Sequence, residues 1–117
     1  MNDHLRHRDV SYHVEDGCLV RTVTGAGGRF YTHRCSKRAF EKVAHAIEET
    51  PAEGQGTTLI DVVGREDLSF TQVNVALEFL KERGIVEVRH RRCYPSTKSV
   101  HLDAMTEFYA LAEQPKP

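Results

Sequence analysis

The pattern of hydrophobic and polar positions is most regular between residues 70 and 83. Val73, Ala76, Leu77 and Leu80 recur at helical spacing, so one face of this segment is expected to lie in a core. Most of the other positions are polar. The pattern therefore predicts a helix over residues 70–83, and the neighbouring segments are best understood in relation to it.

Both ends of this helix carry boundary signals. Ser69 and Gln72 match a capping box, in which the Ser69 hydroxyl accepts a hydrogen bond from the Gln72 amide and the Gln72 side chain returns to the Ser69 amide. Leu68 and Val73 occupy the positions of a hydrophobic staple over that cap. Gly84 can adopt the left-handed conformation that ends a helix.

The segments on either side complete a short series of elements. Thr58 and Asp61 form a second capping pattern and Gly64 a stop signal, which together predict a short helix over residues 58–64. After Gly84, alternating polar and apolar residues predict a strand over residues 85–92 and a second strand over residues 99–103. A turn-rich loop at residues 93–98 joins the two predicted strands. The predicted order is helix, turn, helix, strand, loop, strand.

This order, with the run ALEFLKERGIVEVRHRR followed by SVHL, resembles the recognition helix and wing of MarR-like and ArsR-like bacterial regulators. In those proteins an apolar-patterned helix ends in a glycine and leads into a basic hairpin. The resemblance covers residues 36–113 and implies a winged helix-turn-helix domain of three helices and a two-stranded wing. It implies DNA binding, although winged domains also serve as protein-docking modules.

The N-terminal part of the chain has a different pattern. Residues 10–34 alternate in short runs separated by glycine-rich turns, which predicts a β-hairpin or a three-stranded meander. Residues 1–9 are polar and are expected to form a flexible terminus.

Two further helices complete an α+β fold. Ser36 is expected to cap a helix over residues 37–49, the first helix of the winged domain. Asp103 is expected to cap a short C-terminal helix over residues 104–113, followed by a tail at residues 114–117. The apolar stripe of the C-terminal helix either folds onto the chain's own core or packs against a twofold mate. A homodimer through this helix or through the N-terminal hairpin is therefore expected as one possible assembly.

Composition narrows the range of functions. The 117 residues suit one domain, and the formal net charge of −1 means that any nucleic-acid surface must be a local patch. No apolar run approaches the roughly 20 residues of a membrane span, and the first residues, which lack an apolar segment, are not expected to form a signal peptide. Three cysteines without an export signal suggest reduced thiols in a cytoplasmic protein.

The strongest functional feature is the predicted wing. Permanent cations gather there with few acids between them, and a tyrosine can add a hydrogen bond to phosphate. The expected phosphate contacts are Arg89, Arg91, Arg92, Lys98 and Tyr94. A solvated hairpin whose charged edges discourage aggregation is the alternative interpretation.

The central helix supplies the expected base contacts. Its outward positions are predicted to be Thr71, Gln72, Asn74, Val75, Glu78 and Glu82. Gln72 and Asn74 can pair with adenine, and Thr71 can meet a thymine methyl group. Glu78 and Glu82 would repel phosphates if they faced a duplex.

Other chemistry has weaker support in the sequence. His33 with Cys35 and His90 with Cys93 invite a metal hypothesis, but zinc needs about four converging ligands and these pairs are far apart. Cys18 is expected at a buried strand position. A redox switch through Cys35 or Cys93 would require exposure and a lowered pKa. No catalytic motif is present, so the expectation is a protein that is not an enzyme and has no cofactor or metal.

Two hypotheses follow from these patterns. The first is a small winged helix-turn-helix protein that binds duplex DNA as a dimer and regulates transcription. The second is a winged-helix module that docks a protein and does not bind DNA.

Overall fold

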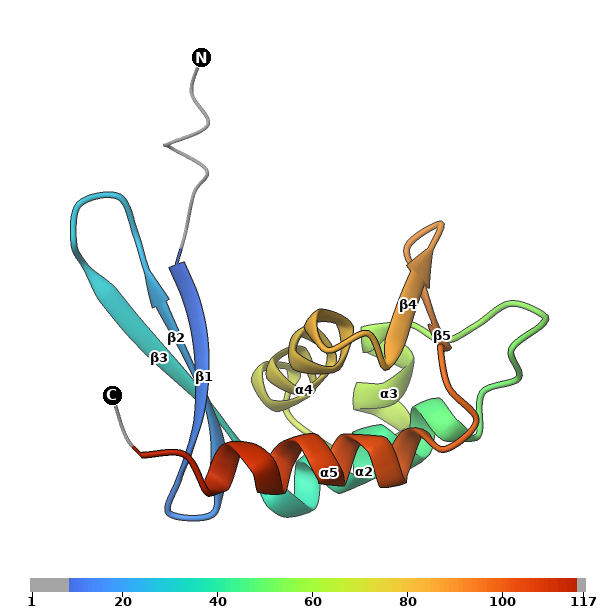
Figure 1. Cartoon of the computed structure of the whole chain (residues 1–117). Coiled ribbons are helices and arrows are strands. Elements are labelled where there is room, and N and C mark those ends of the chain that lie inside the picture. The colour runs from blue at the N-terminus through green and yellow to red at the C-terminus, as the bar shows by residue number, and fades with distance from the viewer. Residues whose placement is uncertain (1–8, 116–117) are drawn as a thin grey trace.

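A three-stranded antiparallel sheet, four helices and a short β-hairpin make up the computed structural model, which describes residues 9–115 (Figure 1). The predicted α+β class is confirmed. The bounds are β1 Asp9–Glu15, β2 Cys18–Thr24, β3 Phe30–Ser36, α2 Lys37–Glu48, α3 Leu59–Glu66, α4 Phe70–Glu82, β4 Val86–Arg89, β5 Arg92–Pro95 and α5 Val100–Ala112. Most of the predicted flexible N-terminus and half of the predicted tail, residues 1–8 and 116–117, lie outside the described residues.

Helix α4 lies between the two sheets (Figure 1). It contacts β3 on one flank, β4 on the other, and α2 and α3 beneath. Phe79 of α4 is at the centre of the core, with ring centroids 5.1 Å from Tyr12 and 5.8 Å from Phe40. Helix α5 runs along α2, where Phe108 lies 5.4 Å from Phe40. One continuous core thus joins the N-terminal sheet to all four helices.

The N-terminal region is a meander of three strands in the order β1-β2-β3. Asp16 and Gly17 form the two-residue turn between β1 and β2, both with positive φ (53° and 76°). Asp-Gly is a favoured pair for such turns because both residues tolerate the left-handed region. The sequence predicted either a β-hairpin or a three-stranded meander over residues 10–34, and the three-stranded meander is confirmed.

Most of the predicted helix caps are present. The side chains of Ser36, Thr58 and Ser69 accept hydrogen bonds from the amides of Ala39, Asp61 and Gln72 at 3.1 Å each. Thr58 and Asp61 form the complete capping box. The predicted return of the Gln72 side chain to the Ser69 amide is wrong, because the Gln72 side-chain oxygen instead accepts from the backbone amide of Ser36 at 3.0 Å.

The predicted stop at Gly84 is confirmed and the predicted stop at Gly64 is wrong. Gly84 has φ 75°, and the Ile85 amide donates to the Leu80 carbonyl at 2.9 Å, which closes α4 in the expected way. Helix α3 continues past Gly64 to Glu66 and ends at Asp67, which is left-handed with φ 56°. Aspartate is among the few non-glycine residues that adopt this conformation readily.

The predicted wing is wrong in both strands, because the first, predicted over residues 85–92, ends at Arg89, and the second is misplaced. Strand β5 is Arg92–Pro95, within the segment predicted as a loop, and the predicted strand at residues 99–103 forms the first part of α5. Val100, Ala104, Phe108 and Leu111 are all buried, a spacing that fits one helix face. A five-residue alternation is too short to distinguish a strand from a helix. The predicted cap at Asp103 therefore lies inside α5.

Candidate nucleic-acid interface

The outward face of α4 is a narrow polar strip. Thr71 is exposed, and Asn74 and Glu78 are half-buried along the same edge. Val75, predicted to be exposed, is fully buried. Other helices cover one side of α4, and the N-terminal sheet covers a second side. Val75 would face solvent on a helix that is covered on one side only, but here it faces the core. The strip is accordingly narrower than the sequence predicted.

The acids of this strip have cationic partners. The Glu78 carboxylate lies 2.9 Å from the Lys81 amine, and the Glu82 carboxylate lies 3.0 Å from the Arg83 guanidinium. These pairs are largely solvated, so they contribute little to stability. They do reduce the negative potential that Glu78 and Glu82 would otherwise present to an approaching polyanion.

Gln72 is not available as a base-reading side chain. Its side-chain oxygen is bonded to the Ser36 amide, so it joins the beginning of α2 to the beginning of α4. Of the three predicted base contacts, Thr71 and Asn74 remain on the outward strip.

The β4–β5 hairpin has two different faces. Its register pairs Val88 with Cys93 on the face toward α4, and Glu87 with Tyr94 on the opposite face. Arg89 and Arg92 are paired with each other at the end of the hairpin. His90 and Arg91 form the turn, with φ values of 51° and 67°.

Arg89 and Tyr94 hold a loop of their own chain. The Arg89 guanidinium stacks 3.8 Å from the centre of the Tyr94 ring and donates to the Ala52 carbonyl at 3.0 Å. Tyr94 is only 7% exposed, and its hydroxyl donates to the Gly54 carbonyl at 3.1 Å. Both were predicted as phosphate contacts. Their internal partners give them a structural role in fixing residues 51–56 against the hairpin.

The predicted cluster of wing cations is only partly assembled. Lys98 lies in the connection between β5 and α5, beyond the base of the hairpin and away from its turn. Arg91 is exposed at the turn and Arg92 is half-buried beside it. Within residues 9–115, neither of these two arginines forms a side-chain hydrogen bond or an ion pair. The free cations of the hairpin are therefore concentrated at Arg91 and Arg92.

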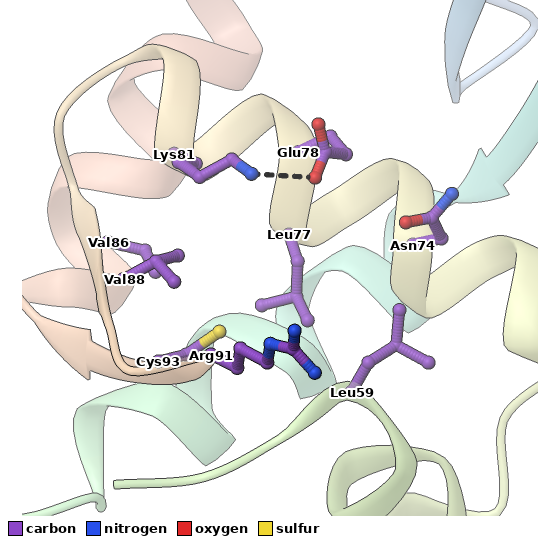
Figure 2. A pocket seen from close by; sticks show the side chains of 9 residues that line it. All are labelled: Leu59, Asn74, Leu77, Glu78, Lys81, Val86, Val88, Arg91 and Cys93. Carbon is purple, nitrogen blue, oxygen red and sulfur yellow. Dashed lines mark ion pairs between the residues drawn. The ribbon is translucent and has the colours of Figure 1, made fainter.

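A pocket of about 180 Å³ lies between α4 and the hairpin (Figure 2). Its apolar lining includes Leu59, Leu77 and Val86, and its polar lining consists of Asn74, Arg91 and the Glu78–Lys81 pair. The Arg91 guanidinium lies beside Leu59 and Leu77 (Figure 2). This pocket brings the outward strip of α4 and the hairpin turn onto one face of the molecule.

The cysteines are poorly suited to redox chemistry. Burial raises the pKa of the Cys35 thiol to about 12 and also raises the pKa of Cys93. Cys18, predicted to be buried, is partly exposed, and Cys35 takes the buried position. A raised pKa reduces the thiolate fraction, which is opposite to what a redox-sensing cysteine requires.

The described part of the chain was compared with the requirements of a metal site and of a membrane-spanning helix. Residues 9–115 contain no group of three or more His, Cys, Asp or Glu side chains placed to hold a metal ion. Over the same residues, no helix combines the length and the apolar character needed to span a bilayer.

A second pocket next to α4 was not foreseen from the sequence. It has a volume of about 250 Å³ and lies on the side of the N-terminal sheet, lined by Val10, Tyr12, Arg21, Val23, Tyr31, Asn74 and Glu78. The one feature of the sequence that could have indicated this pocket is Arg21. It is a charged residue between Leu19 and Val23, which point inward from the same face of β2.

Comparison of the chain with protein-family models, with curated proteins and with solved structures gave no match. The functional argument therefore depends on the residues and geometry described above.

Proposed function

We propose that this chain is a winged-helix protein that binds duplex DNA and regulates transcription. In this proposal α2, α3 and α4 are the three helices, β4–β5 is the wing, and α4 approaches the major groove. The order of these elements and the close approach of the wing to the outward strip of α4 support it.

One observation carries the proposal: Asn74 of α4 and Arg91 of the hairpin turn line the same pocket. A side chain able to pair with a base edge and a cation able to meet a phosphate thus share one face. The proposed contacts are Thr71 and Asn74 for bases and Arg91 and Arg92 for phosphates. Gln72, Arg89 and Tyr94 are left out because their polar groups are engaged within the chain.

The composition of the hairpin turn also supports the proposal. Both tight hairpins among residues 9–115 have two-residue turns with positive φ values. The β1–β2 turn uses Asp16 and Gly17, whereas the β4–β5 turn uses His90 and Arg91. Non-glycine residues in this conformation cost about 1 kcal/mol or more each. Strain of this kind is common where side chains are needed for binding.

The test is titration of a random-sequence duplex at low salt, followed by the same titration as the salt concentration rises. Two phosphate contacts per subunit predict a slope of roughly −2 per subunit in log K against log salt. Arg91→Gln and Arg92→Gln should each flatten this slope by about 1. Arg34→Gln, on β3, is a charge-matched control, because Arg34 is exposed and paired with Glu15. Absence of any salt-sensitive binding would remove the proposal.

A twofold assembly is part of the same proposal, since paired half-sites are usually read by dimers. Leu102 and Tyr109 on the outer side of α5 are 65% and 48% exposed and would form one contact surface. The edges of the N-terminal sheet would form the alternative contact surface. Sedimentation equilibrium of the wild type and of Leu102→Glu would measure the assembly directly.

Protein docking without DNA binding is the second candidate function. The observation in its favour is the apolar wall of the α4–hairpin pocket, at which Val88 is 43% exposed. Val88→Asn should strongly weaken protein docking, because it places a polar amide on this apolar wall. The same neutral substitution would leave the salt slope of duplex binding nearly unchanged if DNA is the ligand, because it adds and removes no charge.

A further inference from the structure

We infer that the pocket between the N-terminal sheet and α4 binds a small organic carboxylate with an apolar body, held by Arg21. This inference does not depend on the proposed DNA binding. It rests on an arginine whose hydrogen-bonding groups are incompletely used and on the residues that surround it.

Arg21 lies in the middle of the sheet, on the side that faces α4. It is in register with Tyr12 on β1 and with His33 on β3. Its Nη2 atom lies 3.2 Å from Nδ1 of His33. Its Nε atom is buried beneath the chain's own atoms and has no hydrogen-bond partner within the described residues, so a ligand in the pocket would be met by the Nη atoms.

Within the described part of the chain, Arg21 also lacks a direct counterion, although Tyr12 is a side-chain hydrogen-bond partner. Among residues 9–115, no carboxylate forms an ion pair with it. Glu78 lines the same pocket, but its carboxylate is 2.9 Å from the Lys81 amine. A partly buried cation without a counterion is unfavourable, and an anion bound beside it would remove that cost.

The form of the pocket favours a carboxylate over a phosphate. An arginine guanidinium matches a carboxylate with two parallel hydrogen bonds. A phosphate dianion usually requires several donors, such as a helix N-terminus or a glycine-rich turn. Among the described residues, Arg21 is the one cation that lines this pocket. The described lining contains no glycine and no helix N-terminus.

The other residues that line the pocket determine the size and the apolar character of the ligand that would fit. Val10, Tyr12, Val23 and Tyr31 surround the arginine with apolar and aromatic surface, and Asn74 adds one amide. The volume of about 250 Å³ suits a short branched chain or a single ring. Tyr31 also has its ring edge-on to His33, with centroids 5.2 Å apart, so Arg21, His33 and Tyr31 form one contiguous group.

The experiment is an NMR titration of the full ¹⁵N-labelled chain with 3-methylbutanoate and 3-phenylpropanoate, each compared with its neutral amide. We expect shifts at Tyr12, Arg21 and Tyr31, with the acid binding at least about tenfold more tightly than the amide, the usual size of a charge-assisted contribution. Equal binding of acid and amide would overturn the inference. So would shifts elsewhere only, or no binding up to about 10 mM, the weak end of measurable affinity.

Two variants separate binding from folding. Arg21→Gln should lower the affinity about tenfold or more, and Arg21→Lys should recover only part of it, because lysine keeps the charge and loses the planar fork. Arg34→Gln on the neighbouring strand should leave the affinity unchanged. If Arg21→Gln does not fold, the acid–amide comparison on the wild type decides the question without it. Unchanged affinity in a folded Arg21→Gln protein would overturn the inference.

Discussion

The side-chain oxygen of Gln72 accepts a hydrogen bond from the backbone amide of Ser36 at 3.0 Å. Ser36 ends β3 and caps α2, while Gln72 lies in the first turn of α4. One contact therefore fixes three elements relative to one another, and it uses a side chain that the sequence alone assigns to DNA.

Removal of this contact is predicted to destabilise the fold. Gln72→Ala leaves the Ser36 amide without its partner and should lower the free energy of unfolding by about 1 kcal/mol, which is a fall in melting temperature of about 4 °C. Gln72→Glu retains an acceptor and should lose less. Thermal melts followed by circular dichroism check this, with the exposed Thr71→Ala as control. A Gln72→Ala protein as stable as the wild type would contradict the structural role.

A glycine in the loop that Tyr94 holds provides the second prediction. Gly56 has φ +67°, and a Cβ at this position would lie 2.7 Å from the Tyr94 ring and 2.9 Å from the Cys93 carbonyl oxygen. Gly56→Ala is therefore expected to lower stability by about 2 kcal/mol, through both backbone strain and overlap. Urea denaturation measures this.

Gly27→Ala is the matched control, because Gly27 has open space around it and no positive φ. Gly56→Ala should also speed hydrogen exchange and proteolysis in residues 51–56, since the loop can no longer rest on Tyr94. Equal stability of the two alanine variants would show that the loop moves freely.

The hairpin turn provides a prediction in which stability and binding change in opposite directions. Replacing His90 and Arg91 by Asn and Gly supplies the residues that the turn geometry favours, and should raise stability by about 1 kcal/mol. The same change removes Arg91 and should weaken duplex binding. Arg92→Gln keeps the turn residues, so it should weaken binding without the gain in stability. Melts and duplex titrations of both variants provide the comparison.

Alkaline pH is predicted to destabilise the protein. Burial raises the pKa of Cys35 from its ordinary 9.0 to about 12, and chiefly burial raises the pKa of Tyr12 from 10.0 to about 12. In the unfolded chain both groups lose their protons at lower pH than in the folded chain. Folded protein therefore binds more protons between pH 9 and pH 12, and its stability falls as the pH rises through that range.

Denaturation at several pH values above 8 tests this prediction. Cys35→Ala and Tyr12→Phe should each flatten the decline, while Thr71→Ala, which removes no titratable group, should leave it unchanged. Cys35 should also react slowly with a thiol reagent in the native state and rapidly in urea. A stability that is independent of pH across this range would contradict the burial of both groups.

The sequence predicted the elements that depend on local signals. Ser36, Thr58 and Ser69 cap helices because a hydroxyl and an amide close together in the chain suffice for the contact, and Gly84 ends α4 for a similarly local reason. The three N-terminal strands follow from alternation and turn residues in the same way.

Features that depend on distant partners were missed. Val75 is buried because the N-terminal sheet covers a second side of α4, and no pattern within α4 reports that contact. Arg89 and Tyr94 are engaged by carbonyls of Ala52 and Gly54, about forty residues earlier in the chain. Residues 99–103 suit either a strand or a helix until Phe108 and Leu111 extend the helical face. The sequence predicted the residues of the candidate site. It did not predict which of their side chains are engaged by other parts of the chain.

Asn74 and Glu78 line both pockets beside α4. An occupant on the sheet side and a duplex on the hairpin side would therefore meet the same two side chains from opposite directions. Thermodynamic linkage makes any influence between the two mutual: whatever factor the carboxylate imposes on the affinity for DNA, DNA must impose on the affinity for the carboxylate. If both proposals hold, one edge of α4 would couple the two binding events.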